Sequence, residues 1–192
     1  MHIDPGQRRF CILDRDGTLI AEKNYLRSVD QLELLPDAVE GLRLLAALGY
    51  GLIVITNQSG IGRGLLTVAE VEAIHAEMVR RLEAEGVHLE RVYYCRHAPS
   101  EGCSCRKPGV ALAAQAAHDF GFDLTKALVI GDNESDIEFG RNCGAQTILV
   151  RTGYGALYAP GTKADLVADN LLEAARTIRY RCGSETSRTS GT

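Results

Sequence analysis

The sequence predicts an α/β fold with a doubly wound, mostly parallel sheet and helices on both faces. Apolar runs without polar alternation recur along the chain, which is typical of strands covered on both faces. Amphipathic stretches separate these runs, and this alternation favours right-handed crossovers and a parallel sheet. Polar residues directly follow several of the apolar runs, which places them at one edge of that sheet.

The expected strands and helices follow one another along the chain. The strands are 10–14, 51–56, 91–95, 127–132, 146–150 and 165–167. The helices are 37–48, 67–85, 110–120, 135–143 and 170–179. The helix 67–85 has a clear beginning, because Thr67 with Glu70 three positions later is the pattern of a capping box.

The length of 192 residues suits one α/β domain. We expect a flexible N-terminus at 1–9, one domain over 10–181 and a disordered tail, rich in Ser, Thr and Gly, at 182–192. The segment between Asp16 and Pro36 is too short for a separate cap domain, so small loops must shield the site.

Composition excludes several classes of function. The formal net charge of −4 argues against a non-specific nucleic-acid binder, which carries a basic face. No apolar run reaches the roughly 20 residues of a membrane helix, and the polar beginning of the chain does not resemble a secretory signal. We therefore expect a cytoplasmic protein that binds neither nucleic acid nor membrane, and a monomer.

The segment Asp14-Arg-Asp16-Gly-Thr18 carries two carboxylates just past a predicted buried strand. Carboxylates at this spacing can share one divalent cation, which a backbone carbonyl of the loop can also reach. One carboxylate can attack phosphorus and split hydrolysis into two easier steps, while its neighbour transfers protons. The alternative is a solvated turn with two surface acids.

Two further segments could serve a phosphoryl group. Thr56 and Asn57 follow the second predicted strand, where a hydroxyl could hold phosphoryl oxygens, although a helix cap or turn is the ordinary role of both residue types. Arg106 and Lys107 supply the positive charge that phosphoryl transfer needs. The alternative for them is a solvated surface pair.

Asp132 ends the fourth predicted strand, and Asp136 follows one helical turn later. Asp132 could be the third anchor of a cation and Asp136 could orient it, although both acids could instead favour a helix N-terminus through its dipole. Asp14, Thr56 and Asp132 each stand at the carboxyl end of a predicted strand, and in an open parallel sheet those ends line one crevice. The three segments therefore point to a single site.

The loop 95–105 gathers three cysteines and one histidine. Three thiolates and one imidazole suit tetrahedral Zn²⁺, and four protein ligands close the coordination sphere, so the site would be structural. The alternatives are free thiols or a redox pair, although C-x-C is not the usual redox spacing. Because the loop directly precedes Arg106 and Lys107, a bound metal would hold these cations in place. The predicted zinc ligands are Cys95, His97, Cys103 and Cys105.

The order of the motifs resembles the haloacid dehalogenase superfamily of phosphotransferases. The resemblance is carried by Asp14-x-Asp16-Gly-Thr18, Thr56-Asn57, Lys107 and Gly131-Asp132-x-x-x-Asp136. It implies a Rossmann-like fold, Mg²⁺ and an aspartyl-phosphate intermediate, with Asp14 as the nucleophile and Asp16 as the general acid/base. Thr56 and Lys107 would stabilise the phosphoryl group. Asp14, the carbonyl of Asp16 and Asp132 would hold Mg²⁺.

The cysteine-rich loop followed by Arg-Lys-Pro resembles one subgroup, which contains heptose bisphosphate phosphatases and histidinol-phosphate phosphatases. The segments 57–64 and 150–153 are similar to the heptose branch, which implies a sugar bisphosphate substrate and a role in lipopolysaccharide biosynthesis, with histidinol phosphate or another small monoester as the alternative. One departure is Asn133, where some heptose enzymes carry Lys. The predicted substrate-binding residues are Arg15, Glu22, Lys23, Asn24, Tyr25, Asn57, Gln58, Ser59, Arg63, Arg106 and Asn133.

Overall fold

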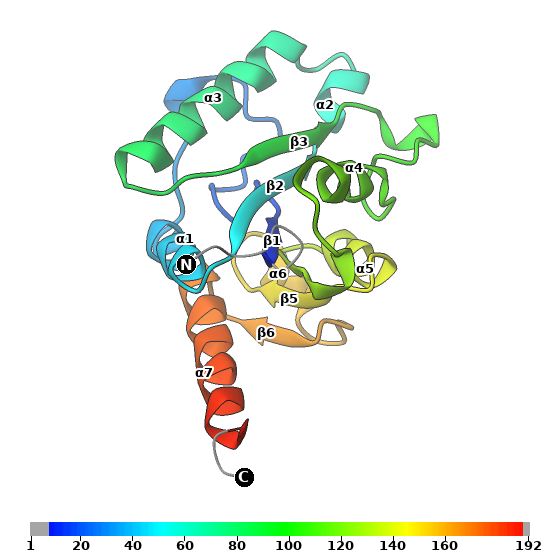
Figure 1. Cartoon of the computed structure of the whole chain (residues 1–192). Helices are drawn as coiled ribbons and strands as arrows, with labels where there is room; N and C mark the ends of the chain where they lie inside the picture. The colour runs from blue at the N-terminus through cyan, green and yellow to red at the C-terminus, as the bar shows by residue number, and fades with distance from the viewer. Residues whose placement is uncertain (1–7, 190–192) are drawn as a thin grey trace.

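The structure, a computed structural model, describes residues 8–189, with side chains described as far as Arg181. A sheet of six strands runs in the order β3-β2-β1-β4-β5-β6, and every neighbouring pair is parallel (Figure 1). The predicted α/β class and each expected strand are confirmed. The strands are β1 (Phe10–Leu13), β2 (Gly51–Asn57), β3 (Arg91–Cys95), β4 (Leu128–Gly131), β5 (Gln146–Val150) and β6 (Leu166–Ala168).

The strand order reverses between β1 and β4. The chain first builds outward from β1 through β2 to β3, then returns to pair β4 with β1 and builds outward on the other side. Crossovers on the two sides of this switch point leave from opposite faces of the sheet, which opens a crevice at the carboxyl ends of the central strands. Asp14 and Asp132 follow the two strands that flank the switch point.

Helices connect the strands, and their caps explain where they begin. The predicted capping box at Thr67 is present, because the Thr67 hydroxyl accepts from the Glu70 N–H and the Glu70 carboxylate accepts from the Thr67 N–H. The helices are α1 (Ala38–Ala47), α2 (Ser59–Gly62), α3 (Val68–Ala84), α4 (Ala111–Phe120), α5 (Glu134–Asn142), α6 (Gly155–Tyr158) and α7 (Leu171–Thr189). Three short 3-10 segments are η2 (Val29–Gln31), η3 (Pro99–Glu101) and η4 (Leu124–Lys126).

Two apolar layers cover the two faces of the sheet. Side chains of β1 alternate between them, because Cys11 and Leu13 belong to one cluster and Phe10 and Ile12 to the other. The first cluster includes buried residues of α1, α3 and α7, and the second includes those of α4 and α5 (Figure 1). Both faces are buried, which is why the strands read as continuous apolar runs.

The structure departs from the predicted elements at several places. The short helices α2 and α6 were not predicted, and α7 ends at Thr189 rather than at 179, so residues 182–189 are helical where we expected disorder. Residues 190–192 and most of the expected flexible segment 1–9 lie outside the described residues. Between Gly17 and Pro36 the regular structure is η2 with isolated bridges, consistent with the absence of a cap domain. Among the described helices, none has the length and apolarity of a membrane span.

Candidate active site

A cavity of about 290 Å³ lies at the carboxyl ends of the central strands. Most of its wall is polar, and four of the predicted motifs contribute to it, so the structure brings together segments that are distant in sequence. The lining residues are Asp14, Asp16, Glu22, Asn24, Tyr25, Thr56, Asn57, Gln58, Ser59, Gly60, Arg106, Lys107, Asp132, Asn133, Ser135, Asp136 and Tyr154.

Lys107 lies at the centre of this cavity wall and is itself buried. Its ammonium contacts Asp14 Oδ1 at 2.6 Å and Asp136 Oδ1 at 2.6 Å, and it donates to the Ile55 carbonyl at 2.8 Å. Burial alone would lower the pKa of Lys107, but the carboxylates of Asp136 and Asp14 outweigh burial and raise it. Lys107 is therefore a fixed positive charge between two carboxylates.

The backbone of Lys107 is held as firmly as its side chain. The Lys107 N–H donates to Asn57 Oδ1 at 3.0 Å, and Asn57 Nδ2 donates to the Lys107 carbonyl at 3.2 Å. The side-chain amide of Asn57, at the end of β2, thus binds both the backbone N–H and the backbone carbonyl of Lys107, which lies fifty positions further along the chain. The main role of Asn57 in this geometry is to position Lys107, although it also lines the cavity.

Asp132 is placed by two glycines and one backbone amide. A Cβ atom at Gly17 or at Gly153 would lie 2.1 Å from Asp132 Oδ2, and both glycines have positive φ. The Tyr154 N–H donates to the same oxygen at 2.8 Å. Because only glycine leaves room at these two positions, the loops after β1 and β5 can close on the Asp132 carboxylate from both sides.

Asp14, Asp132 and Asp136 form a cluster whose carboxylate oxygens lie within 4.8 Å of one another. Burial, followed by the neighbouring acids, raises the pKa of Asp14 to about 7 and that of Asp132 to about 8. Three carboxylates against the one ammonium of Lys107 give a formal charge of minus two when all are ionised. One divalent cation would neutralise that charge, and oxygen donors are the ligands that Mg²⁺ prefers. The donor set therefore fits Mg²⁺.

Asp16 belongs to a separate network beside this cluster. Its carboxylate accepts from the Arg15 guanidinium and from Gln58 Nε2, and the same Gln58 amide donates to Thr56 Oγ1 at 2.9 Å. Asp16 and Thr56 both line the cavity, whereas Arg15 does not and is 2% exposed. Gln58 therefore links two of the predicted catalytic residues, Asp16 and Thr56.

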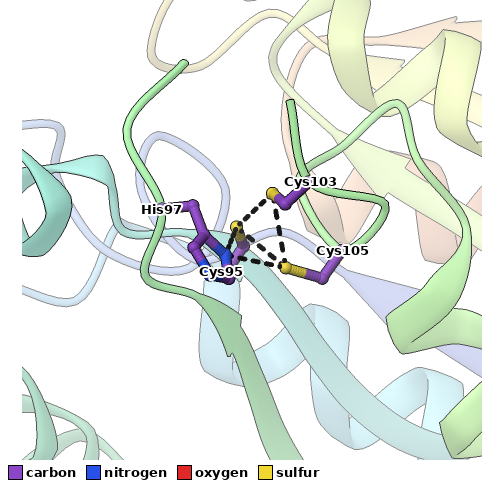
Figure 2. A group of neighbouring side chains, drawn as sticks. All are labelled: Cys95, His97, Cys103 and Cys105. Carbon is purple, nitrogen blue, oxygen red and sulfur yellow. Dashed lines mark hydrogen bonds between the residues drawn. The ribbon is translucent and has the colours of Figure 1, made fainter. Parts of the chain in front are cut away.

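The four predicted zinc ligands lie at the end of β3 and in the loop after it, and their side chains point toward one another, as Figure 2 shows. Cys105 Sγ lies 3.2 Å from Cys95 Sγ, 3.5 Å from Cys103 Sγ and 3.2 Å from His97 Nδ1. Sulfurs bound to Zn²⁺ at about 2.3 Å in a tetrahedron lie about 3.8 Å apart, slightly farther than these separations. The five cysteines whose side chains are described are free thiols.

The thiol chemistry of this group also fits a metal. Burial raises the pKa of Cys95 to about 12, whereas for Cys103 hydrogen bonds from its neighbours outweigh the opposing effect of burial and lower the pKa to about 7. A metal ion bound at this group would take all three sulfurs as thiolates, because a coordinating thiol loses its proton. Three sulfurs and one imidazole nitrogen are a soft set that suits Zn²⁺ better than Mg²⁺.

Most of the predicted substrate-binding residues line the cavity, but three do not. Lys23 is exposed and pairs with Glu33 at 3.2 Å, and Arg63 is exposed at the end of α2. Arg15 is buried behind Asp16. A predicted contact that does line the cavity, Asn133, also caps α5, because its Oδ1 accepts from the Ser135 N–H at 3.1 Å.

Sequence reasoning missed Gly60, Ser135 and Tyr154 as lining residues, and it gave Asp136 only an orienting role. Asp136 lies in the carboxylate cluster and pairs with Lys107, which no local pattern indicates. A signal for Tyr154 was available, because it directly follows the singled-out segment 150–153 at the end of a central strand. Its hydroxyl lies 3.4 Å from Asn24 Oδ1, across the mouth of the cavity.

Comparison with known proteins first gives the class. A HAD-hydrolase-like family model matches residues 104–174, which include Lys107, Asp132 and Asp136. This match, the parallel sheet and the carboxylate cluster at its switch point together define a haloacid dehalogenase-like phosphatase.

The particular family follows from near full-length relatives. The D-glycero-beta-D-manno-heptose-1,7-bisphosphate 7-phosphatase of Pseudomonas aeruginosa is 34% identical over 89% of this chain and 98% of that protein. The D-glycero-alpha-D-manno-heptose-1,7-bisphosphate 7-phosphatase of Photorhabdus laumondii is 30% identical over 88% and 96%. The chain belongs to the D-glycero-D-manno-heptose-1,7-bisphosphate 7-phosphatase family.

A solved structure supports the same assignment. The crystal structure of D,D-heptose 1,7-bisphosphate phosphatase from B. bronchiseptica, complexed with magnesium and phosphate, has a TM-score of 0.83 and 30% sequence identity to this chain. The similarity covers 91% of this chain and 99% of that one. The two folds therefore correspond over nearly their whole length.

Proposed function

We propose that this chain hydrolyses the C7 phosphate ester of D-glycero-D-manno-heptose 1,7-bisphosphate and leaves heptose 1-phosphate. The observation that carries the proposal is the Asp14 carboxylate, 12% exposed and held 2.6 Å from the buried Lys107 ammonium at a polar cavity. A buried carboxylate beside a fixed cation is placed both to attack phosphorus and to have its product, a phosphorylated carboxylate, stabilised. Near full-length relatives of this specificity support the choice of sugar.

Asp14 is the nucleophile in this proposal. Its Oδ1 accepts from Lys107 Nζ, so we assign the attack on phosphorus to Oδ2. The bond from Asp14 to phosphorus forms as the ester bond to the sugar oxygen breaks. Lys107 would stabilise the transferring phosphoryl group through its charge, because its three N–H groups already face Asp14, Asp136 and the Ile55 carbonyl. The Thr56 hydroxyl, which lines the same cavity, would donate to a phosphoryl oxygen.

The residues that would hold Mg²⁺ are Asp14, Asp132 and the backbone carbonyl of Asp16, and Asp136 is the third acid of the carboxylate cluster. When bound, the ion would offset the charge of the phosphate and of the carboxylates. The contribution of this chain is to keep Asp132 in place through Gly17, Gly153 and the Tyr154 N–H.

Asp16 would transfer the proton. Its carboxyl would protonate the leaving sugar oxygen and later take a proton from the water that hydrolyses the aspartyl-phosphate. Water oxygen forms the new bond to phosphorus as the bond to Asp14 breaks, which returns the free carboxylate and releases inorganic phosphate. Asp16 lines the cavity with its side chain 18% exposed, so substrate can reach it.

Arg106 would bind the second phosphate of the substrate. It lines the cavity, and its Nη1 is buried without a hydrogen-bond partner among the described residues. A buried, unpaired guanidinium N–H is costly in the free protein and is satisfied by an anionic oxygen. Zinc held by the adjacent Cys105 and its partners would fix the position of Arg106 without taking part in bond breaking.

The test is phosphate release with Mg²⁺ from the two anomers of heptose 1,7-bisphosphate and from histidinol phosphate, assayed in parallel. We expect faster turnover of a heptose bisphosphate, with heptose 1-phosphate as the product by mass spectrometry and NMR. Arg106→Ala should raise KM for the bisphosphate more than for a sugar monophosphate. A clear preference for histidinol phosphate would reject the heptose assignment while leaving the roles of Asp14 and Lys107 in place.

A further inference from the structure

Arg15 stands between the two acids of the first motif but does not line the cavity. Its Nε donates to Asp16 Oδ2 at 3.0 Å, and its Nη2 donates to Asp16 Oδ1 at 2.9 Å. This is the two-point arrangement by which a planar guanidinium fixes the plane of a carboxylate. Arg15 is therefore directed at Asp16 and not at a bound sugar phosphate.

Gln58 completes the same arrangement from the β2 side. Its Oε1 accepts from Arg15 Nη2 at 3.0 Å, and its Nε2 donates to Asp16 Oδ2 at 2.9 Å. The orientation of the amide follows from chemistry, because a guanidinium only donates and must face the amide oxygen. Gln58 thus couples the carboxylate to Thr56 Oγ1, which accepts from the same Nε2.

The two carboxylate oxygens of Asp16 are not equivalent in this network. A carboxylate offers about four acceptor sites, two on each oxygen. Arg15 Nε and Gln58 Nε2 donate to Oδ2, and Arg15 Nη2 also lies 2.8 Å from that oxygen, whereas among the described residues Oδ1 accepts from Arg15 Nη2 alone. Oδ1 is consequently the oxygen with an acceptor site left to carry a proton.

His75 does not compete for Asp16. It is a buried residue of α3, near enough to Arg15 and Asp16 to be influenced by both charges. Burial, with help from the Arg15 charge, lowers the pKa of His75 to about 3. The imidazole is neutral at physiological pH, so Arg15 is the cation that controls this carboxylate.

A buried ion pair of this kind is weak evidence for stability, because desolvation of the two charges offsets most of their attraction. Arg15 Nη1 even lacks a hydrogen-bond partner among the described residues, which adds to the cost. Such a group is better explained by the orientation that it imposes on Asp16.

We propose that Arg15 and Gln58 are positioning residues that lock the Asp16 carboxyl in one orientation and reserve Oδ1 for proton transfer to the leaving alcohol. The inference rests on the proposed function and adds to it the residues that hold the general acid. In the first step the Oδ1–H bond breaks and the bridging ester oxygen takes that proton, while phosphorus passes to Asp14. In the second step Oδ1 takes a proton from the attacking water.

The dependence on leaving group tests this directly. An alkyl alcohol needs the proton as it departs, whereas p-nitrophenolate is stable without it. Arg15→Lys keeps the positive charge but loses the two-point hydrogen bonding of the guanidinium to the carboxylate. Arg15→Met loses both the charge and the hydrogen bonds. The alkyl ester is whichever of the heptose bisphosphates or histidinol phosphate the unsubstituted protein hydrolyses fastest, and p-nitrophenyl phosphate is the aryl ester.

We expect Arg15→Lys to lower kcat/KM, which reports the steps up to phosphoryl transfer and not the hydrolysis common to both esters, about tenfold or more on the alkyl ester and less than about threefold on the aryl ester. Arg15→Met and Gln58→Met should also lower the ratio of alkyl-ester to aryl-ester activity. The decrease should be larger for Arg15→Met. The ratio of the two activities in one preparation does not depend on how much of it is folded, so instability cannot imitate the result.

Arg81→Lys is the matched control, because Arg81, on α3, pairs with Glu77 and donates to the Leu32 carbonyl, and none of these residues lines the cavity. It should leave both activities unchanged. Equal losses on the two esters in the Arg15 variants would overturn the positioning role. Failure of the unsubstituted protein to hydrolyse any of the alkyl esters would instead reject the proposed function, and this inference with it.

Discussion

The carboxylate cluster and the cysteine loop both gather metal-binding side chains, but the chain holds them in different ways. Asp14 and Asp132 follow central strands, and backbone atoms of the sheet and of its glycine turns fix them. The cysteine loop follows an edge strand, β3, and its regular structure is the short segment η3. The first site is built by the fold, whereas the second needs its own ligands to be ordered.

The two regions meet at Lys107. Its side chain belongs to the carboxylate cluster, and its backbone continues the cysteine loop two residues after Cys105. Asn57 at the end of β2 binds that backbone on both sides. The difference between the regions teaches that the Asn57 amide ties the loop to the sheet at Lys107, and we propose that a metal bound by the four ligands would hold the rest of the loop.

The largest effect should come from the sheet-borne site. We expect Asp14→Asn to lower kcat at least about 10³-fold, because an amide is a poor nucleophile for phosphorus. Thermal unfolding should show a folded protein, since burial already disfavours the Asp14 charge in the absence of a cation. The control is Asp169→Asn, at an acid that is 68% exposed and pairs with Arg151. An active Asp14→Asn protein would exclude covalent catalysis by this residue.

The cysteine loop should act through position alone. Cys103→Ser should lose zinc, measured by elemental analysis, and lower kcat/KM about 10- to 100-fold because Arg106 and Lys107 lose their support. The control is Cys143→Ala, which changes a buried cysteine outside the cysteine loop, in the apolar layer that includes α4 and α5. This variant should retain zinc and activity. Full activity and full stability in zinc-free Cys103→Ser would show that the loop is ordered without metal, and the contrast between the regions would fail.

Asn57 separates the contribution of the sheet from that of the metal. Asn57→Ala removes two partly buried hydrogen bonds to the backbone of Lys107, so we expect about a tenfold loss of kcat/KM with zinc content unchanged. Asn142→Ala is the matched control, because Asn142 is an exposed amide that binds the next carbonyl, that of Pro108, at 3.1 Å. If both variants behaved alike, the Asn57 contacts would not be what positions Lys107.

The smallest effect is a pH dependence of stability in the carboxylate cluster. Burial raises the pKa of Asp14 to about 7 and of Asp132 to about 8, above the unfolded value near 4. The metal-free folded protein therefore binds more protons than the unfolded chain, and its stability decreases as pH rises through this range. Mg²⁺ binds the deprotonated cluster, so its stabilising effect should increase over the same range.

Thermal unfolding with and without Mg²⁺, between about pH 5 and about pH 8, measures this difference. We expect the shift in Tm caused by Mg²⁺ to grow by a few degrees from the acidic to the basic end. A shift that stayed constant with pH would mean that the cluster does not change protonation when it binds the ion.

Sequence predicted the regular parts of the site for a physical reason. The end of each apolar run in the sequence marks the end of a strand, and Asp14, Thr56 and Asp132 lie at such ends. A parallel sheet brings these ends to one edge, so the three residues must lie near one another. The zinc ligands of the cysteine loop could also be predicted from the sequence, because Cys95, Cys105 and the two ligands between them lie in one short segment.

The directions in which side chains point could not be predicted from the sequence in the same way. Arg15 was predicted to bind substrate, yet the turn after β1 directs it into the protein toward Gln58. The pairing of Asp136 with Lys107 joins α5 to a loop that precedes α4, and it depends on how the helices pack on the sheet. For Tyr154 the sequence offered its position after the segment 150–153, whereas the bond from its N–H to Asp132 forms only in the tertiary structure.

The central claim is that Asp14 carries the phosphoryl group, and trapping tests it most directly. The protein is mixed with Mg²⁺ and substrate, quenched in acid during turnover, reduced with borohydride and mapped by peptide mass spectrometry. Borohydride converts an acyl phosphate of aspartate into homoserine, so we predict homoserine at position 14 and its absence when substrate is omitted. Homoserine at another aspartate, or none at any position while phosphate is released, would contradict the account.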